Sequence, residues 1–282
     1  KDYPTPDSKQ GLVELIEHPG GQAATTVTAC ARLGWRARYV GRFGSDARGQ
    51  QAHRSLAAEG IDLSMCETVD APQAVSLILV DGDGRRTVLW QRAAALNLTA
   101  DDVQHDVVAA GRVLHVDCHQ TAAATQAAVY ARRAGVPTVV DVETVRPGID
   151  RLLAEIDILI AAGEFPEAYT GVSGIGAALA ALASEFRPAL VCVTLGPEGS
   201  LALVDGTEIR TPGFEVPVVD TTGAGDVFRG GFIAGWLGAG PDPDAETVLA
   251  YANAVAALKC RGLGARAMIP RPDEVTQLLR NA

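Results

Sequence analysis

Short apolar runs alternate with alanine-rich segments from residue 100 to the C-terminal end of the chain. The alanine-rich segments, such as Ala122–Ala134 and Ala177–Glu185, have the composition and length of helices. This alternation predicts an α/β layer fold with a largely parallel central sheet. The expected strands are Val113–Val116, Thr138–Val140, Ile156–Ile160, Leu190–Val193 and Leu201–Val204, and the last expected helices are Tyr251–Lys259 and Asp273–Arg280.

The pattern before residue 100 is different. Helices are predicted at Gln22–Leu33 and Gln50–Glu59, each followed by a glycine that closes it. A short strand is expected at Arg38–Val40, and residues 74–90 predict a hairpin around the Asp-Gly-Asp-Gly turn at 81–84. Leu12–Glu17 is predicted to be a strand with one polar face, which together with the hairpin forms a small separate sheet.

The composition is that of a globular protein and excludes several classes of partner. The chain has 282 residues, of which 48% are hydrophobic and 21% charged, and its net charge is −10 at pH 7. Bulk charge of this sign does not hold nucleic acid or an anionic membrane. No apolar run is long enough to span a membrane, and we expect no signal peptide. The five cysteines are widely spaced without a CxxC, so we expect neither disulfides nor a zinc site, and a cytoplasmic protein.

One stretch, Val219–Gly231, carries the most specific chemical signal. Its centre, Gly223-Ala224-Gly225, is a turn of small residues that leads into an apolar run of helical length. Unpaired N–H groups at the start of such a helix form an anion site, typically for phosphate. Asp226 follows the turn directly, and two interpretations are open for it. It is either a helix-start aspartate that favours the dipole or a base beside a bound phosphate chain.

The stretch from Asp220 to Ile233 resembles the C-terminal signature of the PfkB/ribokinase family of sugar and nucleoside kinases. The family also has an N-terminal signature, a Gly-Gly pair followed by two glycines at fixed distances. Two long motifs about 200 residues apart are far more specific than a single glycine motif. The resemblance extends to about Gly264. The glycines that match the N-terminal signature are Gly20, Gly21, Gly34 and Gly44.

The resemblance implies a three-layer ribokinase-like α/β fold, in which helices cover both faces of a mostly parallel sheet. It implies a single domain over residues 1–282, with a small β-sheet lid formed by residues of about 11–18 and 73–92. Members of the family have a buried N-terminal strand that ends in a sugar-binding aspartate. This sequence does not contain that strand, and we interpret it as lacking its first segment. The resemblance also implies a homodimer formed through the lid.

The reaction implied is transfer of the γ-phosphoryl group of ATP, with Mg²⁺, to a sugar hydroxyl. Asp226 would be the general base that accepts the hydroxyl proton. Backbone N–H groups of the turn would stabilise the charge on the transferring group. Asp220 and Thr222 match positions that help bind a monovalent cation such as K⁺, although capping and turn formation also explain them. The turn residues assigned to the anion hole are Gly223, Ala224 and Gly225.

A second segment is expected to face the nucleotide. Thr194-Leu195-Gly196-Pro197-Glu198-Gly199 follows an apolar strand directly, and α/β sheets bind ligands at such strand ends. An ordinary strand–loop turn is the alternative, and the resemblance favours a nucleotide-phosphate loop with Thr194, Gly196 and Gly199. Asn253 and Gly264 match the wall of the adenine pocket in the family, whereas the alternative for Asn253 is a solvent-facing helix residue.

The sugar side departs from the family at one position. The family usually has asparagine where this chain has Thr25, and a hydroxyl has a shorter reach and fewer donors, which leaves the identity of the sugar open. Asp117, at the end of a predicted strand, could touch the sugar. Arg92 and Arg86 in the lid could bind a substrate phosphate or be solvated charges. The other positions expected to contact the sugar are Gly20, Gly21 and Asp46.

A second departure concerns magnesium. The family usually has an N-x-x-E motif that orders magnesium-bound water, but residues 162–167 contain no asparagine. Glu164 is the candidate acid and Glu167 its rival. Magnesium is expected because phosphates transferred from ATP need their charge neutralised.

Several alternatives remain. His115, Asp117 and His119 alternate and could share a face as metal ligands. A dinucleotide-dependent oxidoreductase would need its glycine motif after an early strand, whereas the phosphate-type glycines here lie late. A nucleoside kinase and a non-catalytic sugar- or nucleoside-binding relative also fit the fold. The interpretation we favour is phosphorylation of a primary hydroxyl on a small sugar, such as ribose, fructose or a ketohexose derivative.

Overall fold

The computed structural model describes residues 6–9, 11–12, 14–80, 86–240 and 243–281. Within these residues the largest sheet has six strands in the order β10-β9-β8-β7-β6-β5. β5 to β8 are parallel, and β9 and β10 add an antiparallel edge. The bounds are β5 (Leu114–Asp117), β6 (Thr138–Val142), β7 (Ile158–Ala162), β8 (Leu190–Thr194), β9 (Ser200–Val204) and β10 (Thr207–Thr211).

The central strands are buried on both faces, which is why they appear in the sequence as continuous apolar runs. Val140, Leu159 and Val191 lie side by side in register and belong to one hydrophobic cluster. Their neighbours along the strands, Ile160 and Cys192, point to the opposite face and belong to a second cluster. Alternation with period two therefore divides the core into two layers, one on each side of the sheet.

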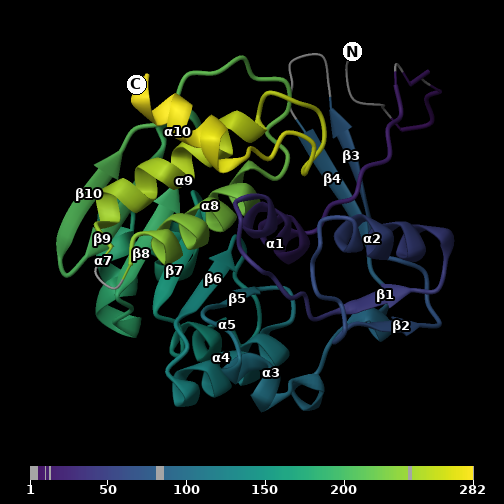
Figure 1. The fold of residues 1–282 in the computed structure, drawn as a ribbon, viewed down its shortest axis with the longest axis horizontal. Coiled ribbons are helices and arrows are strands. Elements are labelled where there is room, and N and C mark those ends of the chain that lie inside the picture. The colour runs from purple at the N-terminus through teal and green to yellow at the C-terminus, as the bar shows by residue number, and fades with distance from the viewer. Residues whose placement is uncertain (1–5, 10, 13, 81–85, 241–242, 282) are drawn as a thin grey trace.

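Helices cover both layers, as predicted (Figure 1). Figure 1 shows α8 and α9 lying side by side across one face. That face is covered by α1 (Gln22–Arg32), α8 (Ala224–Gly238) and α9 (Ala245–Lys259), with α10 (Pro272–Arg280) against α9. The other face is covered by α4 (Thr121–Ala134), α5 (Ile149–Leu153), α6 (Phe165–Thr170) and α7 (Ile175–Phe186), with α3 (His105–Ala109) against α4. No helix of the described ranges is long and apolar enough to cross a membrane.

Glycines in α8 let its neighbours approach closely. A Cβ at Gly230 would lie 2.4 Å from the Cβ of Ala29 on α1, and a Cβ at Gly231 would lie 3.1 Å from the Cα of Ala252 on α9. Larger residues at either position would push the helices apart. The glycine pair of the signature therefore lets the middle of α8 pack closely between α1 and α9.

Between α1 and residue 100, the described residues form a smaller layer with two short two-stranded sheets. β1 (Arg42–Gly44) pairs in parallel with β2 (Glu67–Val69), and β3 (Val75–Val80) pairs with β4 (Arg86–Gln91) as the predicted hairpin. The 81–84 turn lies outside the described residues. The strand predicted at Arg38–Val40 is wrong, because that segment makes one isolated bridge, from Arg38 to Asp62, and the strand starts at Arg42. The second helix, α2 (Ala47–Ala57), begins three residues earlier than predicted.

The strand predicted at Leu12–Glu17 is also wrong. The described residues of this range form no strand, and Leu12 and Leu15 are 70% and 69% exposed. A strand needs a neighbour for its N–H and C=O groups, and no described strand pairs with this segment. Its contact with the rest of the protein includes an exposed ion pair, in which Arg48 Nη2 lies 2.8 Å from Glu17 Oε1. The lid therefore has the hairpin strands β3 and β4 without the third strand that we predicted.

Candidate active site

The turn before α8 has the geometry of an anion site. Gly223 is the N-cap residue and has a φ of 76°, and a Cβ at this position would lie 2.8 Å from the Cβ of Ala265. The N–H of Val227 donates to the carbonyl of Gly223 at 2.9 Å, whereas the N–H groups of Gly225 and Asp226 make no hydrogen bond to another described residue. Two donors are therefore available at the positive end of a 15-residue helix.

Ala224 was predicted to supply an N–H group to the anion hole, but its N–H group already has a partner. The N–H of Ala224 donates to the carbonyl of Thr221 at 3.1 Å and so closes the turn. Ala224 therefore shapes the turn, whereas the N–H groups of Gly223, Gly225 and Asp226 have no partner among the described residues.

Asp226 lies in the first turn of α8, and its side chain is half-buried. Desolvation raises its pKa to about 6, the positive charge of Arg229 opposes this rise, and the negative charges of Glu143 and Asp117 add to it. The positive charge of Arg266 also lowers the pKa of Asp226. A carboxylate that titrates near neutral pH can hold a proton taken from a hydroxyl, which favours the interpretation as a base.

The negatively charged neighbours of Asp226 come from the carboxyl ends of parallel strands. Asp117 is the last residue of β5, and Glu143 follows β6 directly. In open α/β sheets, ligands bind at this edge. Asp117 Oδ1 accepts the backbone N–H of His119 at 3.0 Å. The described residues contain no group of three potential metal ligands, so the alternative metal site of His115, Asp117 and His119 is not formed.

A buried ion pair beneath Asp226 was missed. Arg229 Nη2 lies 2.7 Å from Asp141 Oδ1, and the two side chains are 3% and 1% exposed. A charged residue in the apolar run of α8 was the available signal, since an arginine facing a packed core needs a partner. Its partner is 88 positions away in the chain and could not be assigned from the sequence.

Arg266 was missed as well, and it determines the environment of Thr25. The Arg266 guanidinium donates to the carbonyl of Gly20 through Nη2, to Thr25 Oγ1 at 3.4 Å and to Ser55 Oγ at 3.3 Å. Burial lowers the pKa of Arg266 to about 10. Thr25 is completely buried, so its hydroxyl belongs to this network. Gly21 stays exposed as the N-cap of α1, with a φ of 94°.

Asp220 links the anion turn to the loop after α9. Its Oδ1 accepts the N–H of Thr222 and its Oδ2 the N–H of Gly264, both at 2.8 Å. These hydrogen bonds lower the pKa of Asp220, although burial acts in the opposite direction. The ammonium of the buried Lys259 donates to the carbonyl of Asp220 at 2.7 Å. Turn formation therefore accounts for Asp220 and Thr222, and a Cβ at Gly264 would lie 2.9 Å from the His18 ring.

The segment after β8 has the expected form of a loop at the sheet edge. Thr194 is the last residue of β8 and is half-buried, and Gly196 is exposed with a φ of 60°. Gly199 is buried, and a Cβ there would lie 2.1 Å from the carbonyl oxygen of Thr211. Gly199 is therefore needed for close packing, while Thr194 and Gly196 are placed where a ligand could reach them.

Asn253 connects this loop to α9. The side chain is 5% exposed, and Nδ2 donates to Ser200 Oγ at 3.1 Å, to the Thr211 carbonyl at 3.2 Å and to the Pro212 carbonyl at 3.3 Å. The alternative of a solvent-facing helix residue is wrong. Asn253 therefore links α9 to the start of β9 and the end of β10.

Two predicted substrate residues have structural partners. Asp46 is the N-cap of α2, because its Oδ1 accepts the N–H of Gly49 at 2.9 Å and that of Gln73 at 3.2 Å. Arg92 is exposed and donates to Asn97 Oδ1 at 2.8 Å and to the Leu96 carbonyl at 3.0 Å. The side chain of Arg86 lies outside the described residues.

The two candidate magnesium-binding acids differ in whether their carboxylates already accept a hydrogen bond. Glu167 Oε1 accepts the N–H of Gly174 at 2.6 Å, so this carboxylate holds the lead-in to α7. Glu164 is exposed after β7, and among the described residues its carboxylate has no hydrogen bond or ion pair. A free carboxylate at the sheet edge fits a magnesium ion whose remaining ligands are nucleotide phosphates and water.

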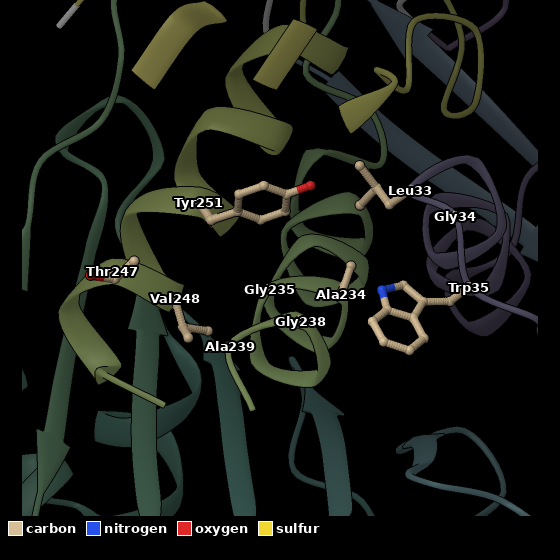
Figure 2. Close-up of a pocket in the computed structure, with 10 residues that line it drawn as sticks. All are labelled: Leu33, Gly34, Trp35, Ala234, Gly235, Gly238, Ala239, Thr247, Val248 and Tyr251. Carbon is tan, nitrogen blue, oxygen red and sulfur yellow. The ribbon is translucent and has the colours of Figure 1, made fainter. Parts of the chain in front are cut away.

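A cavity of about 480 Å³ lies away from these residues. It is lined by the segment that follows α1, by the C-terminal end of α8 and by the first half of α9. The lining residues are Leu33, Gly34, Trp35, Ala234, Gly235, Gly238, Ala239, Thr247, Val248 and Tyr251. Figure 2 shows the rings of Trp35 and Tyr251 facing it from opposite sides. This cavity is at the far end of α8 from Gly223, so it is separate from the candidate active site.

Comparison with known proteins identifies the class. Residues 7–272 match the model of the pfkB family of carbohydrate kinases. The chain therefore belongs to this family, as its two glycine motifs predicted, and it is a sugar or nucleoside kinase.

Individual relatives cover nearly the whole chain. A fructokinase of Klebsiella pneumoniae is 32% identical over 95% of this chain and 94% of its own length. An ATP-dependent ribose-1-phosphate kinase of Halopiger xanaduensis is 33% identical over 98% of this chain and 91% of its own length.

The fold is shared with solved structures. An Agrobacterium tumefaciens protein that carries a provisional description as a ribokinase has a TM-score of 0.90 and 25% identity, over 99% of this chain and 92% of its own. An E. coli protein provisionally described as a ribokinase II, solved with ATP and Mg²⁺, has a TM-score of 0.83 and 22% identity, over 97% of this chain and 95% of its own.

Proposed function

We propose that this protein is an ATP-dependent sugar kinase that phosphorylates a primary hydroxyl of a small sugar, such as ribose, fructose or another ketohexose. The observation that carries the proposal is the position of Asp226. Asp226 and the residue before it supply two free N–H donors at the start of α8, and the carboxylate of Asp226 lies near acidic side chains at the carboxyl edge of the sheet. Base and anion site are thus adjacent, as phosphoryl transfer to an alcohol requires.

In the proposed reaction, Asp226 accepts the proton of the sugar hydroxyl as the oxygen attacks the γ-phosphoryl group. The N–H groups of Gly225 and Asp226 donate to the charge that develops on the transferring group. Mg²⁺, when bound with ATP, neutralises charge on the phosphates, and Glu164 would hold it through water. Thr194 and Gly196 would face the phosphates, and Gly264 the adenine side. Asp220 and Thr222 would shape a K⁺ site beside the turn.

The surroundings of Asp226 support an uncharged sugar as the acceptor. Asp117 and Glu143 place two further carboxylates near the base, and ionised carboxylates accept hydrogen bonds from hydroxyl groups. A substrate phosphate or carboxylate at the same place would be repelled. Gly20 and Gly21 would contact the sugar from the other side, in a segment whose Gly20 carbonyl accepts a hydrogen bond from Arg266.

We also propose that residues 1–282 act as one domain that forms a homodimer through the lid, in the cytoplasm. The hairpin exposes Val88, Leu89 and Trp90, and Trp90 is 69% exposed. Val88 and Trp90 lie on one face of β4 and Leu89 on the other, so the hairpin exposes apolar side chains on both faces. Exposed apolar side chains gathered on one hairpin favour a protein partner. All five cysteines are free thiols, as in proteins of a reducing compartment.

The test is release of ADP from Mg-ATP over a panel of pentoses, hexoses, ketohexoses, sugar acids, sugar phosphates and nucleosides. The proposal expects turnover with a neutral sugar that has a primary hydroxyl. Turnover with a nucleoside alone would make the protein a nucleoside kinase of the same fold. Binding without turnover, measured by thermal shift on the same panel, would indicate a non-catalytic relative and contradict the proposal.

A further inference from the structure

The ion pair beneath Asp226 connects the start of α8 to the sheet. Arg229 is three residues after Asp226 on α8, and its Nη2 reaches two strands. This nitrogen lies 2.7 Å from Asp141 Oδ1 on β6 and donates to the carbonyl of Ile160 on β7 at 3.2 Å. Arg229 and Asp141 are both almost completely buried, so neither can be a surface charge.

The guanidinium also lies directly against the anion turn. A Cβ at Gly225 would be 2.6 Å from Arg229 Nη1, and this is the nearest heavy atom to that position. Because Nη2 is held by Asp141 and Ile160, the guanidinium cannot easily move away. The glycine in the turn therefore makes room for a positive charge underneath the free N–H donors.

Stability alone is a weak reason for such a pair. Removing two charges from water costs more than the attraction returns unless hydrogen bonds satisfy the remaining atoms. In the described residues, Arg229 Nε has no hydrogen-bond partner, and the two Asp141 oxygens have none beyond the ion pair itself. The Arg229–Asp141 ion pair leaves some of its hydrogen-bonding atoms without a partner. An effect of the pair on Asp226 therefore explains it better than a gain in stability does.

We propose that Arg229 is a positioning residue for the kinase reaction, which holds the first turn of α8 against β6 and β7 and keeps Asp226 in its ionised, proton-accepting form. Asp141 is the buried counter-charge that holds the guanidinium in place. The inference rests on the proposed function, because it assigns Arg229 a task only if Asp226 is the base.

Charges on four elements face Asp226. Asp117 on β5 and Glu143 after β6 favour its protonated form, whereas Arg229 on α8 and Arg266 after α9 favour the ionised form. Arg229 is the larger of the two positive contributions. Removing it leaves the acidic neighbours incompletely opposed, so the pKa of Asp226 rises further.

Asp141 responds to the same charges. Burial raises its pKa to about 8, Arg229 opposes this rise, and the negative charge of Asp226 adds to it. Replacing Asp141 by asparagine breaks the ion pair but leaves the guanidinium charge beside Asp226. The two halves of one ion pair are therefore predicted to affect the base differently.

The experiment compares the pH profiles of kcat/KM for wild type, Arg229→Gln, Arg229→Lys and Asp141→Asn. Arg229→Gln is expected to move the acid limb up by about one pH unit. Because the wild-type limb lies at about pH 6, this shift means about fivefold less activity at pH 6 and about tenfold less at pH 5, and the loss is recovered near pH 9. Arg229→Lys, which keeps the charge, is expected to restore most of the wild-type limb. Asp141→Asn is expected not to move the limb upward.

A purely structural pair predicts another result. Arg229→Gln and Asp141→Asn would then lose activity to the same extent at every pH, and this outcome would overturn the proposal. If Arg229→Gln does not fold, an upward shift in Asp141→Asn, which loses no cation, would overturn it equally.

A second readout does not need turnover. The carboxyl ¹³C resonance of Asp226, assigned by its loss in Asp226→Asn, reports the pKa directly in wild type and in each variant. A rise in Arg229→Gln supports the inference even if the substrate is absent from the panel, and an unchanged value contradicts it. If wild type phosphorylates no compound of the sugar panel, the proposed function fails, and this result is distinct from the ¹³C result for Arg229.

Discussion

Gly223 is the position in the anion turn at which one added methyl group should have the largest effect. Its φ of 76° is in the left-handed region, and an alanine Cβ there would lie 2.8 Å from the Ala265 Cβ and 3.1 Å from both the Cα and the carbonyl oxygen of Ala265. Two of these three neighbours are backbone atoms, so no side-chain rotation relieves the contact. Gly223→Ala must therefore shift either the turn or the loop after α9.

The expected cost has two parts. The left-handed conformation of a non-glycine residue costs about 1–2 kcal/mol. Overpacking against an unyielding neighbour adds about 1–3 kcal/mol. The matched control is Gly135→Ala at the end of α4, because Gly135 has a φ of 69° and no atom within 4 Å of the added Cβ. The control has only the first part, so Gly223→Ala should lose about 1–3 kcal/mol more free energy of unfolding.

Urea unfolding followed by circular dichroism measures both variants. At this chain length each kcal/mol also lowers Tm by about 2–4 °C, so a thermal scan gives an independent value. Phosphoryl transfer should fall in Gly223→Ala and stay near wild type in Gly135→Ala. Equal destabilisation of the two variants would refute the steric argument, because the strain of φ would then be the whole effect.

Three further predictions follow from single side chains. Asn253→Ala should lower the free energy of unfolding by about 1–3 kcal/mol, measured by urea unfolding, because Nδ2 bonds two carbonyls and a hydroxyl in the core; an unchanged value would contradict this role. The folded-state pKa of Asp226 is raised from 3.8 to about 6, so its contribution to stability is present below about pH 4 and is lost as pH rises through 6. Asp226→Asn should therefore have a higher Tm than wild type at pH 7, and the difference should vanish near pH 4; a difference independent of pH would contradict the assigned cause. Trp90→Ser should weaken self-association in sedimentation equilibrium if the hairpin is the dimer contact, and an unchanged mass distribution would exclude that surface.

The central sheet was predictable because its signal is local. Strands β6, β7 and β8 are buried on both faces, so runs such as Leu190–Val193 are apolar whatever their neighbours are. The same pattern failed at Leu12–Glu17 and Arg38–Val40, where a strand depends on a partner elsewhere in the chain. Residue spacing does not show whether such a partner is present.

The candidate site was predictable in part for the same reason. The turn at Gly223 and the acid at Asp226 lie within one motif, and the structure keeps them together at the start of α8. Arg229 and Asp141 come from elements far apart in the sequence, and their contact exists only after β6 packs beneath α8. The hydrogen bonds of Asn253 depend in the same way on where β9 and β10 end.

The most direct test of the account is the rate of phosphoryl transfer by Asp226→Asn at saturating Mg-ATP, with the sugar that wild type prefers. The amide has nearly the same shape and cannot accept the proton, so the account predicts that kcat falls by about 10²–10⁴-fold while nucleotide binding is retained. Turnover at the wild-type rate would show that Asp226 is not the base and would contradict the mechanism at its centre.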